Sequence, residues 1–392
     1  MASISLISKV KQSHFLYSLY YYVGSFAINV LKLFLKTDDK LVLFVSYGGK
    51  KYDDSPKDIF EAMLKDERFI GYKKVWAFRN PRSFSIGADA SITIDTLDYY
   101  KTALRAKVWV TNVGVTRGLN FKGINTLSVN SWHGTPIKRI GNDAKREDTF
   151  VGKSDPVDVQ LAQGDYEVER YSEAFKIPKE NVKKTGLPRN DSLVYGNTPM
   201  NIIALKKKMG IPVDKKVILY APTYRDYELE NGSECIMRPP FDLKKWEEHF
   251  GGEYVLLVRA HIAVMKVLDL RENEFVRDFS TYPTLNDILL VTDILISDYS
   301  GILFDYSILG RPMFCYTYDY DKYDQMRGMY FDIRKELSFS GNEEDMIDKI
   351  CNINWEVETK KAERFRDKYV QVYGDASKKV VDIIYDCLSR NS

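Results

Sequence analysis

Short apolar runs that stop abruptly at polar signatures constrain the fold of this chain more than any other feature. Helix-like stretches separate these runs, and the stretch 55–64 is one of them, with Ser55 available as a cap and Pro56 in the first turn. Strands that alternate with helices predict parallel βα units. The runs of the first half are residues 41–46, 74–78, 91–95, 108–112 and 126–130.

A second series of apolar runs begins near residue 200. Its members are residues 216–221, 254–258, 294–296 and 312–316. A chain of 392 residues suits two domains rather than one. We therefore expect an α/β protein of two doubly wound, Rossmann-like domains that face each other across a cleft.

The polar stretch 190–201 marks the expected boundary between these domains. The stretch 228–240 is predicted to be an inserted loop, and residues 360–388 a helical tail restarted after Gly374 with Asp375 or Ser377 as the cap. The expected division is an amphipathic, membrane-associating segment, an N-terminal acceptor domain, and a C-terminal donor domain that includes the final helix. The corresponding ranges are 1–37, 38–195 and 196–392.

Three runs of the second series end in polar clusters, which parallel strands would bring to one edge of a sheet. The clusters are Pro222-Thr223, Arg259-x-His261 and Ser297-Asp298-x-Ser300-Gly301. A helix is predicted from Gly301 to Leu309, and its first turn would suit a phosphate. Asp305 would accept hydrogen bonds from substrate hydroxyls or favour the helix start. The alternative readings are a helix cap for Ser-Asp-x-Ser and a surface ion-pair partner for Arg-x-His.

Two features of the first half are candidates for chemistry. His133 follows a predicted strand within Trp132-His133-Gly134-Thr135-Pro136, where an imidazole is suited to general base catalysis. A structural histidine at a tight turn explains the same pattern. Arg189, in the stiff stretch 186–191, is shaped for bidentate phosphate contact, although a helix-capping turn is the competing interpretation.

Several classes of protein are excluded by absent motifs or by composition. The chain has no P-loop, no Gly-x-Gly-x-x-Gly and no Gly-x-Ser-x-Gly, and its net charge of +2 gives no reason to expect nucleic acid as a partner. Asp319-Tyr320-Asp321 resembles the Asp-x-Asp of metal-dependent glycosyltransferases but equally fits a solvated loop, so no metal or cofactor is expected. The cysteines lack metal spacing and suit reduced packing residues: Cys235, Cys315, Cys351 and Cys387.

Residues 15–35 form an apolar stretch rich in aromatic side chains and flanked by lysines. This composition favours a helix in the interface of an anionic membrane. A helix packed on the N-terminal domain and a true membrane span are the alternatives. A signal peptide is not expected, because no small-residue cleavage site follows.

The ordered set of motifs resembles the CDP-glycerol glycerophosphotransferase family, the polyol-phosphate transferases of teichoic acid and capsule synthesis. Order and spacing agree over roughly residues 40–388. The stretches that carry the resemblance are SWHGTPIKRIG at 131–141, GLPRND at 186–191, APTYRD at 221–226, RAH at 259–261, SDYSGILFDY at 297–306 and RGMYFD at 327–332.

The resemblance implies a GT-B fold, a CDP-glycerol or CDP-ribitol donor, and an acceptor hydroxyl on an undecaprenyl-diphosphate-linked saccharide or polymer. It also implies a peripheral location at the cytoplasmic face of the bacterial membrane. The family often has a second serine where this chain has Gly301, so a phosphate contact there would come from the backbone. The family's donor site, carried over, falls on His133, Gly134, Thr135, Pro136, Ile137, Arg189, Pro222, Thr223, Arg259, His261, Ser300, Gly301 and Asp305.

In the expected mechanism the acceptor hydroxyl attacks the donor phosphorus nearest the polyol, and CMP leaves. His133 is the expected general base, with Asp143 as its replacement if it fails. His261, Arg189 and Arg259 would stabilise charge on the phosphates. The long amino-terminal extension of polymerising members does not precede these motifs, which favours a primase-like or short-chain enzyme. The alternatives are a nucleotide-sugar glycosyltransferase of GT-B fold and a non-catalytic membrane-bound scaffold.

Overall fold

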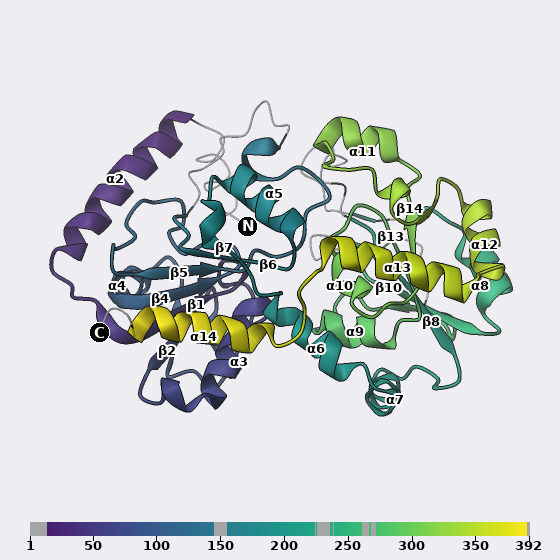
Figure 1. Cartoon of the computed structure of the whole chain (residues 1–392), viewed down its shortest axis with the longest axis horizontal. Coiled ribbons are helices and arrows are strands. Elements are labelled where there is room, and N and C mark those ends of the chain that lie inside the picture. Colours follow the sequence, from purple (N-terminus) through teal and green to yellow (C-terminus); the bar gives the residue numbers. More distant parts are fainter. Residues whose placement is uncertain are drawn as a thin grey trace. The chain divides into compact units, whose positions relative to one another are not determined.

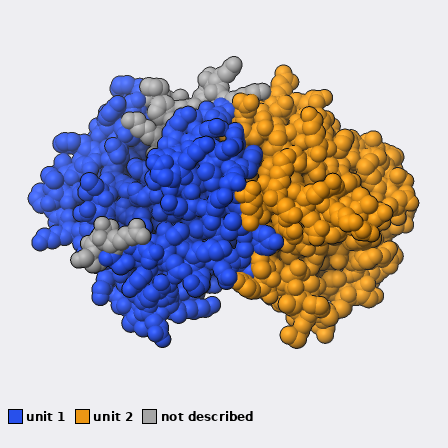
Figure 2. Space-filling view, viewed as in Figure 1, with its two compact units in different colours: residues 1–133, 141–191, 372–392 blue, residues 134–140, 192–371 orange. Residues whose placement is uncertain are grey.

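A computed structural model describes residues 14–144, 155–223, 225, 236–237, 239–260, 266–267 and 272–389. The chain divides into two units, coloured separately in Figure 2. Unit 1 comprises residues 1–133, 141–191 and 372–392, and unit 2 comprises residues 134–140 and 192–371. The main division thus falls at 191/192, near the expected 195/196. Unlike in the expected division, the final helix belongs to unit 1, and a short stretch after His133 belongs to unit 2.

Unit 1 is built on a parallel sheet in the order β3-β2-β1-β4-β5-β6-β7 (Figure 1). Its central strands are buried on both faces, so they read as continuous apolar runs rather than as alternating ones. The described strands are β1 (Asp38–Val45), β2 (Lys73–Phe78), β3 (Ala90–Thr93), β4 (Ala106–Thr111), β5 (Leu127–Asn130), β6 (Val159–Ala162) and β7 (Val182–Lys184).

Helices cover both faces of this sheet. Phe44 and Trp76 point to the face where α3 and α14 pack, with Phe60 of α3 and Ile384 of α14 in the same core. Side chains at the alternate positions of these strands, such as Leu43, lie on the opposite face of the sheet, where they pack against α4 and one side of α2. The helices of unit 1 are α2 (His14–Lys32), α3 (Asp54–Lys65), α4 (Leu97–Arg105), α5 (Asp165–Phe175) and α14 (Ala376–Ser389), and α6 (Asp191–Gly196) leads into unit 2.

Unit 2 contains a second parallel sheet, in the order β12-β10-β8-β13-β14-β15. Its described strands are β8 (Lys216–Tyr220), β10 (Tyr254–Val258), β12 (Val276–Asp278), β13 (Ile294–Ser297), β14 (Met313–Tyr316) and β15 (Ser338–Ser340), and β9 (Ile236–Met237) pairs separately with β11 (Lys266–Val267). Its helices are α7 (Pro199–Lys208), α8 (Leu243–Phe250), α9 (Leu285–Val291), α10 (Ile302–Ser307), α11 (Tyr320–Arg327), α12 (Glu343–Cys351) and α13 (Trp355–Tyr369). Trp246 of α8 and Met346 of α12 pack on one face, while Phe304 of α10 meets Phe365 of α13.

The predicted fold class is confirmed, since two parallel α/β sheets of seven and six strands are present in the described chain. The apolar runs predicted near residues 41, 74, 91, 108 and 126 correspond to strands β1 to β5. Those predicted near 216, 254, 294 and 312 correspond to β8, β10, β13 and β14. Strands β6, β7, β12 and β15 were not predicted, because polar residues interrupt the apolar pattern in all four of these short strands.

Two local expectations were wrong. Asp53, not Ser55, caps α3: its side chain accepts a hydrogen bond from the N–H of Asp54, and Ser55 lies inside the helix. Among the cysteines, Cys315 is buried as expected for a packing residue, but Cys351 is exposed. Most of the expected insertion 228–240 and Cys235 lie outside the described residues.

Candidate functional site

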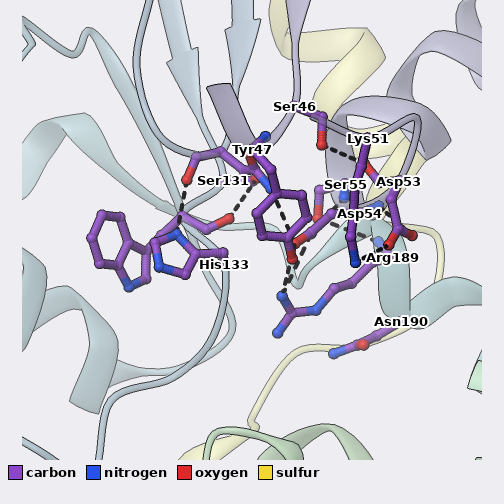
Figure 3. A network of polar contacts seen from close by, with 12 residues as sticks. Ser46, Tyr47, Lys51, Asp53, Asp54, Ser55, Ser131, His133, Arg189 and Asn190 are labelled. Atoms are coloured by element: carbon purple, nitrogen blue, oxygen red, sulfur yellow. Dashed lines mark hydrogen bonds and ion pairs between the residues drawn. The ribbon is translucent and has the colours of Figure 1, made fainter. Parts of the chain in front are cut away.

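The carboxyl ends of β1, β4 and β5 form a polar cluster in unit 1 (Figure 3). Strands β1 and β4 flank the point where the strand order reverses, which is where open parallel sheets bind ligands. The loop after β1 forms the short 3₁₀ helix η1 (Tyr47–Gly49), Asn112 follows β4, and Ser131 to His133 follow β5. His133 was predicted as a candidate from its place after a strand, whereas Tyr47 and Asn112, which also follow predicted strands, were not.

His133 is exposed, and its Nδ1 lies 3.1 Å from the backbone oxygen of Asn112. A carbonyl oxygen only accepts hydrogen bonds, so this contact favours the tautomer with the proton on Nδ1. In the neutral ring Nε2 then carries the lone pair that a general base needs. Trp132, which precedes His133, has a left-handed φ of 52° and its ring centroid lies 4.0 Å from that of the imidazole.

Arg189 lies in the 3₁₀ helix η6 (Pro188–Asn190), in the same unit and close to the same edge. Its Nη1 is 3.3 Å from Oδ2 of Asp54, and the two side chains are 13% and 2% exposed. The arginine predicted to contact phosphate is therefore also one partner of a buried ion pair. Asp54 was not a candidate in the sequence, because its partner is 135 residues away.

The 186–191 stretch also contributes a helix cap, because Asp191 caps the start of α14. The carboxylate of Asp191 accepts hydrogen bonds from the N–H groups of Ala376 and Ser377, at 2.9 and 2.8 Å. The cap of α14 is therefore Asp191 and not Asp375 or Ser377, the two residues that were predicted for this role. Asp375 has a left-handed φ of 55° at the turn before the helix.

Two of the three polar clusters expected in unit 2, those after β8 and β13, are in contact, and β10 is a neighbour of β8 in the same sheet. Oδ1 of Asp298, after β13, accepts the N–H and the hydroxyl of Thr223, after β8, at 2.8 and 2.5 Å. It also accepts the N–H of Tyr299 at 2.6 Å. Asp298 therefore fixes two strand-end loops against each other.

Arg225, which lies in the 221–226 motif but was not predicted as a site residue, completes this cluster. Its guanidinium lies 2.9 Å from Oδ2 of Asp298 and 2.8 Å from Oδ2 of Asp319, with all three side chains largely buried. Its carbon Cζ is also 5.2 and 5.0 Å from the ring centroids of Tyr299 and Tyr323. Burial alone would lower the pKa of Arg225, but the charge of Asp298 and the hydrogen bond to Asp319 raise it instead.

Asp319 thus has an arginine partner, and Asp321 lies in α11. In the part of the chain that the structure describes, no group of three His, Cys, Asp or Glu side chains has the arrangement of a metal site. Asp143, the alternative base, lies in η4 (Gly141–Asp143) of unit 1.

Arg259 follows β10 at the same edge of unit 2. Its Nη1 donates to the backbone oxygens of Phe279 and Tyr282, both at 2.9 Å, so its side chain also braces a neighbouring loop. His261, which completes the Arg-x-His signature, lies outside the described residues.

The predicted helix after β13 is α10, with Gly301 as its N-cap. The helix has six residues instead of the predicted longer run, so its dipole is small. Ser300 Oγ accepts the N–H of Ile302 at 3.4 Å, and Asp305 is 5% exposed. The buried Asp305 leaves little of its carboxylate accessible to a ligand.

The stretch 134–140 belongs to unit 2, where it runs antiparallel to residues 328–330. Tyr330 donates its N–H to the oxygen of Ile137, and Arg139 donates its N–H to the oxygen of Gly328, at 2.9 and 3.0 Å. Thr135, Pro136 and Ile137 are buried. Two motifs of the resemblance, at 131–141 and 327–332, are therefore hydrogen-bonded partners.

The arginine of the unit 2 cluster gives a stability prediction. Replacing Arg225 by Leu leaves the buried carboxylates of Asp298 and Asp319 without their cation, which typically costs about 3–5 kcal/mol. Arg225→Lys keeps the positive charge but loses the planar guanidinium that contacts both carboxylates, so it should lower the stability less than Arg225→Leu. Urea unfolding followed by tryptophan fluorescence measures both, with the exposed Arg364→Leu as the control. Equal unfolding midpoints for Arg225→Leu and the control would contradict a structural role of the cluster.

Comparison with known proteins relates this geometry to a family. Residues 27–386 match the family CDP-Glycerol:Poly(glycerophosphate) glycerophosphotransferase. A teichoic acid poly(glycerol phosphate) polymerase of Staphylococcus epidermidis is 35% identical over 76% of this chain, which spans only 43% of that relative. A teichoic acid glycerol-phosphate transferase of Staphylococcus aureus is 32% identical, covering 82% of this chain and 86% of the relative.

The solved wall teichoic acid polymerase TagF has a similar fold. It aligns with a TM-score of 0.83 and 29% identity over 95% of this chain and 99% of the solved one. Histidine-to-asparagine variants of that polymerase have been solved, including one soaked with CDPG. With the match over residues 27–386, these likenesses show that the chain belongs to the CDP-glycerol:poly(glycerophosphate) glycerophosphotransferase family.

Proposed function

We propose that this enzyme transfers glycerol phosphate from CDP-glycerol to a hydroxyl of a lipid-linked saccharide or polymer in teichoic acid synthesis, and releases CMP. The observation that carries the proposal is the position of His133. It stands at the carboxyl edge of the unit 1 sheet with Nδ1 against a carbonyl oxygen, so that Nε2 is the basic nitrogen. Family membership supplies the donor, because this is the reaction that the family's name describes.

In the proposed reaction the acceptor oxygen attacks the donor phosphorus that bears glycerol. The bond between that phosphorus and the bridging oxygen breaks, and CMP leaves with the oxygen. The proton of the acceptor hydroxyl passes to Nε2 of His133. Arg189, Arg259 and His261 stabilise the charge that develops on the phosphates.

The remaining donor contacts are assigned to Pro222, Thr223, Ser300, Gly301 and the stretch 134–137. Their support is that Thr223 and Ser300 end neighbouring strands in unit 2, while Gly301 lies against Gly134 and Thr135. Asp305 is the weakest member of this set, since it is buried. The alternative donor is CDP-ribitol.

A donor screen tests the reaction class. Purified protein with a lipid-linked disaccharide analogue is expected to release CMP from CDP-glycerol, and only when the acceptor is present. The assay compares CDP-glycerol, CDP-ribitol and UDP-sugars, and mass spectrometry of the product counts the additions. Release of UDP from a UDP-sugar would overturn the proposal in favour of a glycosyltransferase, and CMP from CDP-ribitol alone would correct the donor.

Substitution of the proposed base tests the mechanism. Loss of a positioned general base typically costs about 10²- to 10⁴-fold in rate, so His133→Ala should lose turnover by this order. Binding of CDP-glycerol, measured by calorimetry, should stay within a few-fold of wild type, because the base acts on the acceptor. The matched control is His249→Ala, an exposed histidine of α8. Near-normal turnover of His133→Ala would transfer the base role to another group, with Asp143 as the first candidate.

Helix α2 supports a peripheral attachment to a membrane surface. One side of α2 packs on unit 1: Ser25 Oγ accepts the N–H of Asn120, and Asn29 Nδ2 donates to the oxygen of the same residue, at 2.9 and 2.7 Å. The packed-helix alternative is thus present in the structure. No helix among the described residues has the length and apolar character that a membrane crossing requires.

The other side of α2 is an exposed apolar stripe. Its members recur at helical spacing, and Phe15, Tyr22 and Phe26 are 74%, 68% and 72% exposed. The full stripe is Phe15, Leu19, Tyr22, Val23, Phe26, Val30 and Leu33. Transfer of one such side chain from water to an apolar phase contributes about 1.5–3 kcal/mol, so this stripe is suited to the apolar layer just below lipid headgroups.

Vesicle binding tests this attachment. The protein should sediment with vesicles that contain phosphatidylglycerol, and Phe26→Asp should weaken that binding, because it places a charge in the middle of the stripe. Met200→Asp is the matched control, since Met200 is 82% exposed in unit 2. Equal sedimentation of wild type and Phe26→Asp would remove α2 from the attachment.

A further inference from the structure

Asp54 is a buried carboxylate at the start of α3 whose backbone is held in the left-handed region. Its φ is 63° and its side chain is 2% exposed. A non-glycine residue pays conformational energy for this geometry, which persists only where the surroundings fix it. Tyr47 and Trp132, at φ of 47° and 52°, share this feature at the same sheet edge. Such residues concentrate at functional sites.

Four donors converge on the Asp54 carboxylate from separate elements (Figure 3). The hydroxyl of Tyr47, from η1, donates to Oδ2 at 2.6 Å, and Nδ2 of Asn112, after β4, donates to it at 3.2 Å. Nη1 of Arg189, from η6, lies 3.3 Å from Oδ2. The N–H of Ser55 donates to Oδ1 at 2.6 Å. Asp54 therefore joins loops from three parts of unit 1.

The contact with Asn112 extends this network to His133. The Asn112 amide is held at both ends, because Nδ2 donates to Asp54 and Oδ1 accepts the N–H of Tyr47 at 2.8 Å. The backbone oxygen of the same residue lies 3.1 Å from Nδ1 of His133. Asp54 is thus connected to His133 through a single residue, Asn112.

We propose that Asp54 is a positioning residue: through Asn112 and Tyr47 it fixes the tautomer and orientation of His133, and by direct pairing it fixes Arg189. The reaction it serves rests on the proposed function, but its effect on the imidazole does not. Asp54 itself has no part in proton transfer, since its oxygens are occupied by the four donors.

The charges around Asp54 are consistent with a permanently ionised group. Burial alone would raise the pKa of Asp54, but Arg189 and the hydrogen bonds from Tyr47, Ser55 and Asn112 lower it overall. A second carboxylate, Asp58 on α3, interacts electrostatically with it. Burial raises the pKa of Asp58 to about 7, with Glu61 and Asp54 adding to the effect. A weakly acidic Asp58 reduces the like-charge repulsion on Asp54.

The test compares Asp54→Asn with Asp53→Asn. The first keeps the shape of the side chain but removes the charge that pairs with Arg189. The second makes the same change at the neighbouring N-cap, where Asn is an equally good capping residue. With CDP-glycerol and acceptor, kcat of Asp54→Asn should fall about 10- to 100-fold, by analogy with the loss of hydrogen-bond partners that orient metal-bound histidines. The KM for CDP-glycerol should change less, and Asp53→Asn should behave as wild type.

A second readout is independent of activity. The chain has only four histidines, so the His133 imidazole can be assigned by NMR with His133→Ala as the reference. In wild type its ¹⁵N shifts should report the Nδ1-protonated tautomer, and in Asp54→Asn a mixture of both tautomers.

The outcomes separate this inference from the proposed function. Unchanged kcat together with an unchanged His133 tautomer in Asp54→Asn would overturn the positioning role. If wild type releases no CMP from any donor, the proposed function fails while the NMR result still decides on Asp54. If Asp54→Asn does not fold, Tyr47→Phe replaces it, since it removes one donor from Asp54. A wild-type tautomer and kcat in Tyr47→Phe would then count against the proposal, and a shift of both would support it.

Discussion

A buried ion pair between an arginine and an aspartate organises the strand-end loops of each unit. In unit 1 it is Arg189 with Asp54, and in unit 2 it is Arg225 with Asp298. Charges removed from water are costly unless they are paired and hydrogen-bonded, so each pair recruits further donors from neighbouring loops. The loops at the carboxyl edges of both sheets are therefore fixed by polar contacts, whereas the apolar strands that support them are fixed by packing.

This arrangement explains why several motif residues have structural contacts although the motifs are functional in appearance. Asp191 of the 186–191 motif caps α14, and Arg259 binds two backbone oxygens. A loop without regular secondary structure has backbone groups to satisfy, and side chains of the same loop are the nearest partners. A short motif in such a protein thus combines residues that face substrate with residues that hold the loop.

The sequence predicted the fold well because buried parallel strands leave continuous apolar runs. It also located the carboxyl edge of each sheet, with His133 in unit 1 and with Thr223 and Ser300 in unit 2, because the end of an apolar run marks the end of a strand. It did not reveal Asp54 or Asp191 as organising groups, since each acts on residues far away in the chain, 135 and about 185 positions on. Nor did it show that the final helix packs in unit 1, because an amphipathic pattern records that a helix is half buried and not which core buries it.

Gly301 shows how packing can account for a departure from a family pattern. A Cβ at this position would lie 3.1 Å from the backbone oxygen of Thr135 and 3.5 Å from the Cα of Gly134. Its φ of −61° is open to any residue, so backbone strain does not require glycine here. The limited space favours glycine instead, because a serine side chain would force the stretch after His133 to shift by a few tenths of an ångström. Glycine gives up a hydroxyl at the helix start and in return lets that stretch pack directly on it, which links the geometry of the 131–141 motif to that of the 297–306 motif.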